Sequence, residues 1–157
     1  MEAMTITPIQ ARKAWNNADN NGKLLLENLL GKDKFQLRDI TDIIKTVNDA
    51  YDYTGNIRVD YSIIPESRRE YIQAVDDAIV IIEALNEGWY PDWNDDTEYK
   101  WIPWYYMGPS AFAFGGSYCD YSLAHAGSGS RLRLKSKALS DYFAKQFPDI
   151  CRKIQLG

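Results

Sequence analysis

The sequence predicts an α+β fold, with helices in the N-terminal half, an antiparallel sheet of three or four strands in the second half, and a C-terminal helix packed on that sheet. In the first half, apolar residues recur every three or four positions, as they do in amphipathic helices. In the second half, an aromatic stretch over residues 89–121 is broken by turn residues, and residues 131–135 alternate basic and apolar side chains. A chain of 157 residues is most simply one domain, spanning residues 1–157.

The first two helices are predicted from their end signals. Thr7 can cap a helix that begins at Pro8, where the missing proline N–H costs nothing, and that ends near Ala18. Asp19 can cap a second helix, and Gly31 supplies the left-handed residue that ends it. The residues of the second helix that we expect to face inward are Leu26, Leu29 and Leu30.

Two further helices precede the aromatic stretch. An apolar stripe predicts one helix over residues 39–52, and a brief alternation over residues 57–61 predicts a short strand or an extended crossing after it. Ser67 and Glu70 have the spacing of a capping box, which predicts the start of the next helix. The apolar stripe of that helix is so wide that the helix must be buried over most of its circumference.

The aromatic stretch holds twelve of the chain's 21 aromatic residues and four of its five tryptophans. Strands are predicted at residues 99–106, 111–114 and 118–123, and the Gly115-Gly116 pair predicts a break or a bulge between the last two. Each aromatic side chain buries ~150–250 Å². Because twelve rings exceed what this half can bury, we expect part of the aromatic surface to be exposed. The alternative is that the rings form an oversized core.

A basic strand is predicted after this stretch. Residues 131–135 alternate strictly, so their two leucines should point into the core and the three cations, Arg131, Arg133 and Lys135, should point outward. Ser136 can cap a last helix, in which Pro148 predicts a kink or a break. Residues 131–157 carry 7 Lys or Arg against 2 Asp or Glu, whereas residues 1–130 carry 11 against 20. This asymmetry can steer an anionic partner to one face, or the two parts can neutralise each other within the fold.

The composition predicts a soluble cytoplasmic protein. No apolar run approaches the ~18–20 residues that a membrane span requires, so we expect no membrane contact. The first residues lack the form of a signal peptide. Cys119 and Cys151 are too few for a disulfide framework, and we expect them to be free thiols.

The sequence offers little support for catalysis or for a cofactor. His125 is the one histidine, and although Asp120 and Ser122 stand near it, no nucleophile motif surrounds them, so a hydrolase is the weakest interpretation. One histidine and two distant cysteines cannot build a zinc site. We expect a protein that is not an enzyme and that has no cofactor and no metal. An acidic turn between the aromatic elements is more typical of solvated side chains than of a hard-cation site, and its carboxylates are Asp92, Asp95, Asp96 and Glu98.

Binding is the function that these observations favour. Aromatic side chains beside cations can stack on bases and pair with phosphates, which would suit RNA or a nucleotide. Tyr, Trp and Arg are equally the residues enriched at protein–protein hot spots. The predicted binding surface consists of Trp93, Tyr99, Trp101, Trp104, Tyr106, Arg131, Arg133 and Lys135.

Parts of the sequence also resemble a known family. The run Asn86-Glu87-Gly88-Trp89-Tyr90-Pro91-Asp92-Trp93-Asn94, followed by Pro103-Trp104 and by Ser130-Arg131-Leu132 with Lys135-Ser136, resembles small phage- and prophage-encoded proteins of Bacteroidetes-type bacteria. The resemblance covers most of the chain, although Pro148 departs from the uninterrupted terminal helix expected of that family. The family has no established reaction or catalytic residues to transfer to this chain.

The resemblance implies an accessory protein of phage origin. Such proteins bind a host protein or ribonucleoprotein, and an inhibitor of a bacterial defence system, for example of an RNA-guided effector in the manner of an anti-CRISPR protein, is the specific expectation. The alternative is a protein that binds or sequesters a small nucleotide-like ligand in an aromatic pocket.

Overall fold

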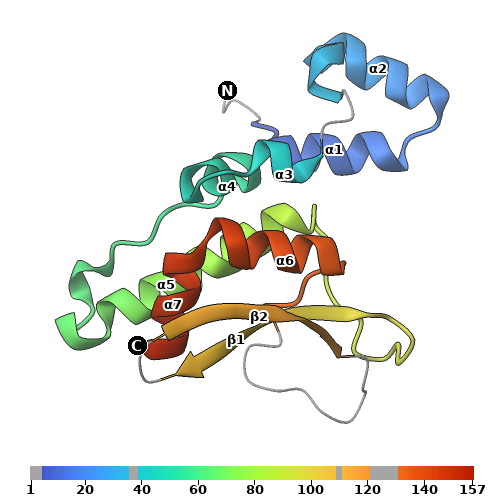
Figure 1. The fold of residues 1–157 in the computed structure, drawn as a ribbon. Helices are drawn as coiled ribbons and strands as arrows, with labels where there is room; N and C mark the ends of the chain where they lie inside the picture. The colour runs from blue at the N-terminus through green and yellow to red at the C-terminus, as the bar shows by residue number, and fades with distance from the viewer. Residues whose placement is uncertain (1–4, 36–38, 109–110, 121–130) are drawn as a thin grey trace.

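The computed structural model describes residues 5–35, 39–108, 111–120 and 131–157, and within them the fold is α+β, as predicted. Figure 1 shows helices α5, α6 and α7 on one side of a β-hairpin, with α1 and α2 farthest from the strands. In chain order the elements are α1 (Pro8–Asn17), α2 (Asn20–Leu30), the 3-10 helix η1 (Lys32–Phe35), α3 (Ile40–Ile43), α4 (Val47–Thr54), the 3-10 helix η2 (Tyr61–Ile63), α5 (Glu66–Leu85), β1 (Lys100–Gly108), β2 (Ala111–Asp120), α6 (Lys137–Gln146) and α7 (Pro148–Leu156).

The core forms around α5, which packs on α4 and α7, while α6 packs on both strands. The second half of α5 is buried almost all round, as its wide apolar stripe predicts. The side chains that are completely enclosed include Ile44, Ile81, Leu85 and Leu134. The C-terminal helix therefore packs on the sheet through α6, and it breaks at Phe147, one residue before the proline that predicts the break.

The helix ends follow the predicted chemistry at the N-terminus. Thr7 caps α1 in a capping box with Gln10, Asp19 caps α2, and Gly31 ends α2 with φ 93°. The expected burial of Leu29 is wrong, because α2 packs mainly on α1 and η1 in the described residues, and this side chain stays exposed. No residue of α1 or α2 is buried, so these two helices make a loosely packed N-terminal layer.

The predicted helix over residues 39–52 is two helices, α3 and α4. The chain leaves α3 at Ile44, and Thr46 begins α4 with a capping box to Asp49, whose carboxylate accepts the backbone N–H groups of Lys45 and Thr46. This box supplies partners for the N–H groups that a new helix leaves unpaired, so it competes with continuation of α3. Of the two predictions for residues 57–61, the short strand does not form, and residues 56–60 connect α4 to η2 without a helix or a strand.

The capping box predicted for Ser67 and Glu70 is wrong. Pro65 occupies the N-cap of α5, and the structure gives that helix no side-chain capping bond. Since proline fixes φ near the helical value, here −51°, the helix begins at Glu66 and Ser67 already lies in its first turn.

Two strands, rather than three or four, form the sheet in the part of the chain that the structure describes. The segments predicted as separate strands on either side of Gly115-Gly116 are one strand, β2, which continues through a bulge. Trp104 pairs with Gly116 and Tyr105 with Phe114, so Gly115 is the extra residue. Residues 121–123 of the predicted last strand lie outside the described residues.

The predicted basic strand is an extended segment that makes one isolated bridge to β1. Trp101 and Leu134 exchange backbone hydrogen bonds of 3.0 and 2.9 Å. Leu134 is enclosed as expected, but the outward position predicted for Arg133 is wrong, because its side chain is only 4 % exposed. The buried Asn86 amide binds the backbone on both sides of Leu134, and this contact holds the segment against the end of α5.

Both cysteines are free thiols, as predicted. Cys151 lies in the core, where burial raises the pKa of its thiol to about 11. Among the described helices, none combines the length and apolar character needed to cross a membrane.

Candidate binding surface

One face of the hairpin belongs to the core. The Ser117 hydroxyl lies 2.7 Å from both the Ser140 hydroxyl and the Asp141 carboxylate of α6, so this side of β2 faces the helices. Tyr105 stacks on Phe112 with ring centroids 4.7 Å apart, and both rings pack on the core. Burial raises the pKa of Tyr105 well above its usual value.

The opposite face of the hairpin carries three large exposed rings. Trp104 and Tyr106 lie two residues apart on β1, and Tyr118 pairs with Ile102, so strand alternation puts all three rings on the side away from α6. Their exposed fractions are 55 % for Trp104, 66 % for Tyr106 and 62 % for Tyr118. We call these three residues the open face.

The rings of the open face are held in place by contacts within the hairpin. Trp104 and Tyr118 meet edge to face, with centroids 5.5 Å apart. Tyr106 covers Gly115, where a Cβ atom would stand only 2.9 Å from Cε2 of the tyrosine ring. Glycine at the bulge therefore lets this ring lie directly on the neighbouring strand.

The structure brings together only some of the predicted surface residues. Trp104 and Tyr106 lie side by side as expected. The predicted surface did not include Tyr118, because residues 118–123 were predicted as a separate strand rather than as part of β2. Trp101 alternates to the other face of β1, where Tyr99, itself exposed, stacks on it at a centroid distance of 6.1 Å. The expectation that part of the aromatic surface is exposed is confirmed, and the role of these rings in binding stays a prediction.

The predicted row of three outward cations is wrong. Arg131 is exposed, Arg133 is buried, and Lys135 is half-buried with its ammonium 2.8 Å from the Glu87 carboxylate. An ion pair of this kind neutralises the charge that the lysine would otherwise present to a partner. The basic surface is thus reduced to Arg131, which lies apart from the open face.

The turn before β1 is organised by one carboxylate and one ammonium. Glu98 accepts hydrogen bonds from the Trp89 indole N–H at 3.0 Å and from the backbone N–H of Asp92 at 2.8 Å. Lys100, only 1 % exposed, places its ammonium 3.3 Å from the same carboxylate and donates to the carbonyl oxygens of Asp95 and Glu98. This network fixes the path of residues 89–98.

The acidic side chains of the turn bind their own backbone. Asp92 accepts the N–H of Asn94, and Asp95 accepts both the N–H and the hydroxyl of Thr97, which lowers the pKa of Asp95. The described residues hold no group of three or more His, Cys, Asp or Glu side chains placed for a metal ion. The turn is therefore built from local hydrogen bonds.

Trp93 lies in a pocket beside the end of α5. The pocket has a volume of about 460 Å³, and its wall includes Trp89, Tyr90, Glu83 and Arg131. Neither Trp89 nor Tyr90 was among the predicted surface residues, although both stand in the aromatic stretch. We call this the aromatic pocket.

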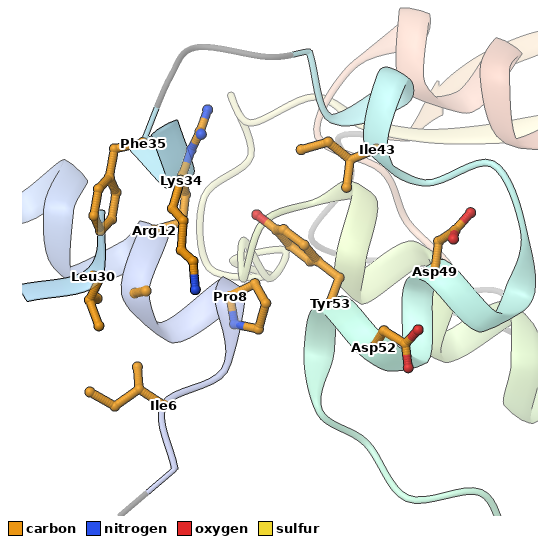
Figure 2. A pocket seen from close by; sticks show the side chains of 11 residues that line it. Ile6, Pro8, Arg12, Leu30, Lys34, Phe35, Ile43, Asp49, Asp52 and Tyr53 are labelled. Atoms are coloured by element: carbon orange, nitrogen blue, oxygen red, sulfur yellow. The ribbon is translucent and has the colours of Figure 1, made fainter. Parts of the chain in front are cut away.

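A second cavity, of about 410 Å³, lies within the loosely packed N-terminal layer. Figure 2 shows Tyr53 reaching from α4 toward α1 in this cavity, while Asp49 and Asp52 point away from its centre. Arg12 lies 3.7 Å from Glu87, and burial raises the pKa of Tyr53 to about 12. Arg12 and Asp49 are tied to the fold by their own partners, and the apolar lining of the cavity matches a gap between loosely packed helices.

His125 and Ser122, and with them the hydrolase alternative, lie outside the described residues. Comparison with protein-family models, with curated proteins and with solved structures finds no match to this chain.

Proposed function

We propose that this chain is a non-enzymatic accessory protein of phage origin that binds a host protein through the open face of its hairpin. The observation that supports the proposal is the adjacency of three rings, Trp104, Tyr106 and Tyr118, each more than half exposed on one face of the sheet. Exposed contiguous aromatic surface of this kind marks interaction sites in soluble proteins.

The rings are suited to be the main contributors to a protein interface. Trp and Tyr dominate interface hot spots, where truncation of one side chain costs about 2 kcal/mol or more. Because Trp104 and Tyr118 pack on each other and Tyr106 rests on Gly115, little side-chain entropy remains to be lost on binding. The hairpin therefore presents a surface that is already ordered.

The charges around the open face favour a protein partner over RNA. RNA affinity depends on cations that neutralise phosphates, but Lys100 and Arg133 are buried and Lys135 is paired with Glu87. The exposed carboxylates Asp92, Asp95 and Asp96 lie in the turn that leads into β1. We infer that the partner surface is apolar at its centre and basic at its rim.

A basic rim is typical of host proteins that bind nucleic acid. Inhibition of a bacterial defence system, such as an RNA-guided effector, is the specific form of this proposal. It is supported by the acidic turn and by the resemblance of the motifs at residues 86–94 and 130–136 to phage-encoded proteins.

The double substitution Trp104→Ala/Tyr106→Ala tests the proposal. The partner is first captured from a nuclease-treated lysate of the host bacterium, then purified and titrated against both proteins by calorimetry. We expect the substitution to weaken binding about a hundredfold or more, since two hot-spot rings are lost. Tyr71→Ala removes an exposed tyrosine from α5, distant in sequence from the hairpin, and should leave the affinity unchanged.

The same experiment separates a protein from a ribonucleoprotein. Capture that disappears after nuclease treatment, with an affinity that falls steeply with salt, would point to RNA and contradict the proposal. Wild-type affinity in the double variant would also contradict it, because the open face would then lie outside the interface.

A further inference from the structure

The aromatic pocket lies at the C-terminal end of α5. Its volume of about 460 Å³ falls within the about 300–1,000 Å³ that small-molecule sites occupy. Three rings line it, Trp89, Tyr90 and Trp93, and Pro91 lies between them in the sequence. Because the open face contributes none of its lining, the pocket can be considered independently of the proposed function.

Two rings of the pocket are held by the network of Glu98 and Lys100 in the turn before β1. The Trp89 indole is bound to Glu98, and the Lys100 ammonium lies 5.4 Å from the Trp93 ring centroid. A cation at this distance attracts the electron-rich face of the ring and restrains it. Two tryptophan rings held by buried or half-buried partners form a surface prepared for stacking.

Most polar groups of the pocket already have partners within the protein. The Glu83 carboxylate accepts from the Asn56 side-chain amide at 2.9 Å. Burial, followed by the charge and the hydrogen bond of Glu83, raises the pKa of Tyr90, and the charge of Arg131 acts in the opposite direction. The Asn86 amide is used by the backbone of Arg133 and Lys135. These groups are already held by partners within the protein, so they are less available to a ligand than an unpaired group would be.

Arg131 differs from the other polar groups of the pocket. Its side chain is exposed, and in the described residues it makes no hydrogen bond or ion pair. A guanidinium has five donors in a planar fork, which suits a phosphate or a carboxylate. A ligand that supplies an anionic group would therefore gain a charge-assisted bond there.

We propose that the aromatic pocket binds a nucleoside monophosphate, with its base stacked on the tryptophan rings and its phosphate paired with Arg131. Base–aromatic stacking favours the binding of any base, because every base has a π-face, and the arginine pair adds a contribution that depends on the phosphate. A quaternary ammonium ion, the other class that an aromatic cage takes, would meet the repulsion of Arg131. The required ligand therefore combines a planar ring with an anion.

Tryptophan fluorescence titration, checked by calorimetry, tests this inference. The probes are AMP, GMP, CMP and UMP, with the four corresponding nucleosides (adenosine among them), inorganic phosphate and tetramethylammonium as partial ligands. We expect saturable binding of at least one monophosphate, weaker binding of its nucleoside, and none of phosphate alone at the same concentration. The order follows because only the monophosphate makes both contacts.

Two substitutions locate the site. Arg131→Ala should weaken monophosphate binding roughly ten- to a hundredfold and leave adenosine binding unchanged. Arg131→Lys should keep part of the preference for the monophosphate over the nucleoside. The double variant Trp104→Ala/Tyr106→Ala should bind the monophosphate like the wild type. Partner binding by this variant tests the proposed function, and its nucleotide binding tests the aromatic pocket. The two proposals can therefore fail separately.

Three results would overturn the inference. One is the absence of saturation by any of the four monophosphates, and another is an Arg131→Ala variant that binds them with unchanged affinity. The third is tighter binding of tetramethylammonium than of every monophosphate, which would identify the pocket as a site for cations.

Discussion

Replacing Glu98 with alanine should lower the free energy of unfolding by about 2–4 kcal/mol. The Lys100 ammonium is almost completely buried and lies 3.3 Å from this carboxylate, which is itself partly exposed. Without Glu98 the buried ammonium keeps its carbonyl partners and the Trp93 ring but has no counter-charge, and the N–H groups of Trp89 and Asp92 lose their acceptor. Urea denaturation followed by circular dichroism measures the change as a shift of the midpoint at constant slope.

A double-mutant cycle isolates the charge pair. Lys100→Met alone should also destabilise, but adding it to Glu98→Ala should cost little more, because the uncompensated charge is then gone. Asp96→Ala, which removes an exposed carboxylate of the same turn, is the control and should leave the midpoint almost unchanged. Equal midpoints for Glu98→Ala and Asp96→Ala would contradict the role assigned to this network.

Replacing Asn86 with alanine should cost about 2–4 kcal/mol as well. The side chain is 3 % exposed, donates to the Arg133 carbonyl at 2.7 Å and accepts the Lys135 N–H at 3.0 Å. Alanine leaves both backbone groups without this partner. A buried polar group that has lost its partner destabilises the fold by more than the original hydrogen bond stabilised it. The extended segment around Leu134 should then detach from α5.

Hydrogen exchange gives a local measure of this change. The amide of Lys135 should lose protection in Asn86→Ala by more than the global loss of stability accounts for, whereas Asn94→Ala, an exposed asparagine, should have no effect. Asn86→Asp keeps an acceptor for Lys135 but sets an oxygen against the Arg133 carbonyl, so it should be no more stable than the alanine variant. A Lys135 amide that stays protected in Asn86→Ala would show that another contact holds the segment.

The starts of α1 and α2 could be predicted from Thr7, Pro8 and Asp19, because the signals of a helix start are local. A side-chain oxygen of the capping residue reaches an N–H group two or three residues away. The split between α3 and α4 has a signal of the same kind, Thr46 followed by Asp49, but the continuous apolar stripe suggested one helix. Pro65 shows the opposite case, in which a backbone constraint displaced a plausible cap at Ser67.

The open face was partly predictable and the basic row was not. Period-2 alternation places Trp104 and Tyr106 together wherever β1 pairs, because it depends on the strand alone. The burial of Arg133 depends on Asn86, which is 47 residues distant in the sequence, and no local pattern encodes that contact. The number of strands was likewise decided by whether Gly115-Gly116 would end a strand or bulge within it.

The motif at residues 86–94 turns out to build the fold around the pocket. Asn86 binds the extended segment, and Glu87, with a left-handed φ of 52°, pairs with Lys135 and lies near Arg12. Gly88 continues the turn with φ 80°. These residues set the direction in which the aromatic stretch leaves α5, so the contacts described for them serve to position the chain.

The measurement that tests the central claim most directly is hydroxyl-radical footprinting of the protein alone and with its purified partner. The proposal predicts that oxidation of Trp104, Tyr106 and Tyr118 is fast in the free protein and falls to the level of the buried Tyr51 in the complex, while exposed Tyr71 reacts equally in both states. Unchanged oxidation of all three open-face rings in a complex that is demonstrably formed would place the interface elsewhere on the molecule.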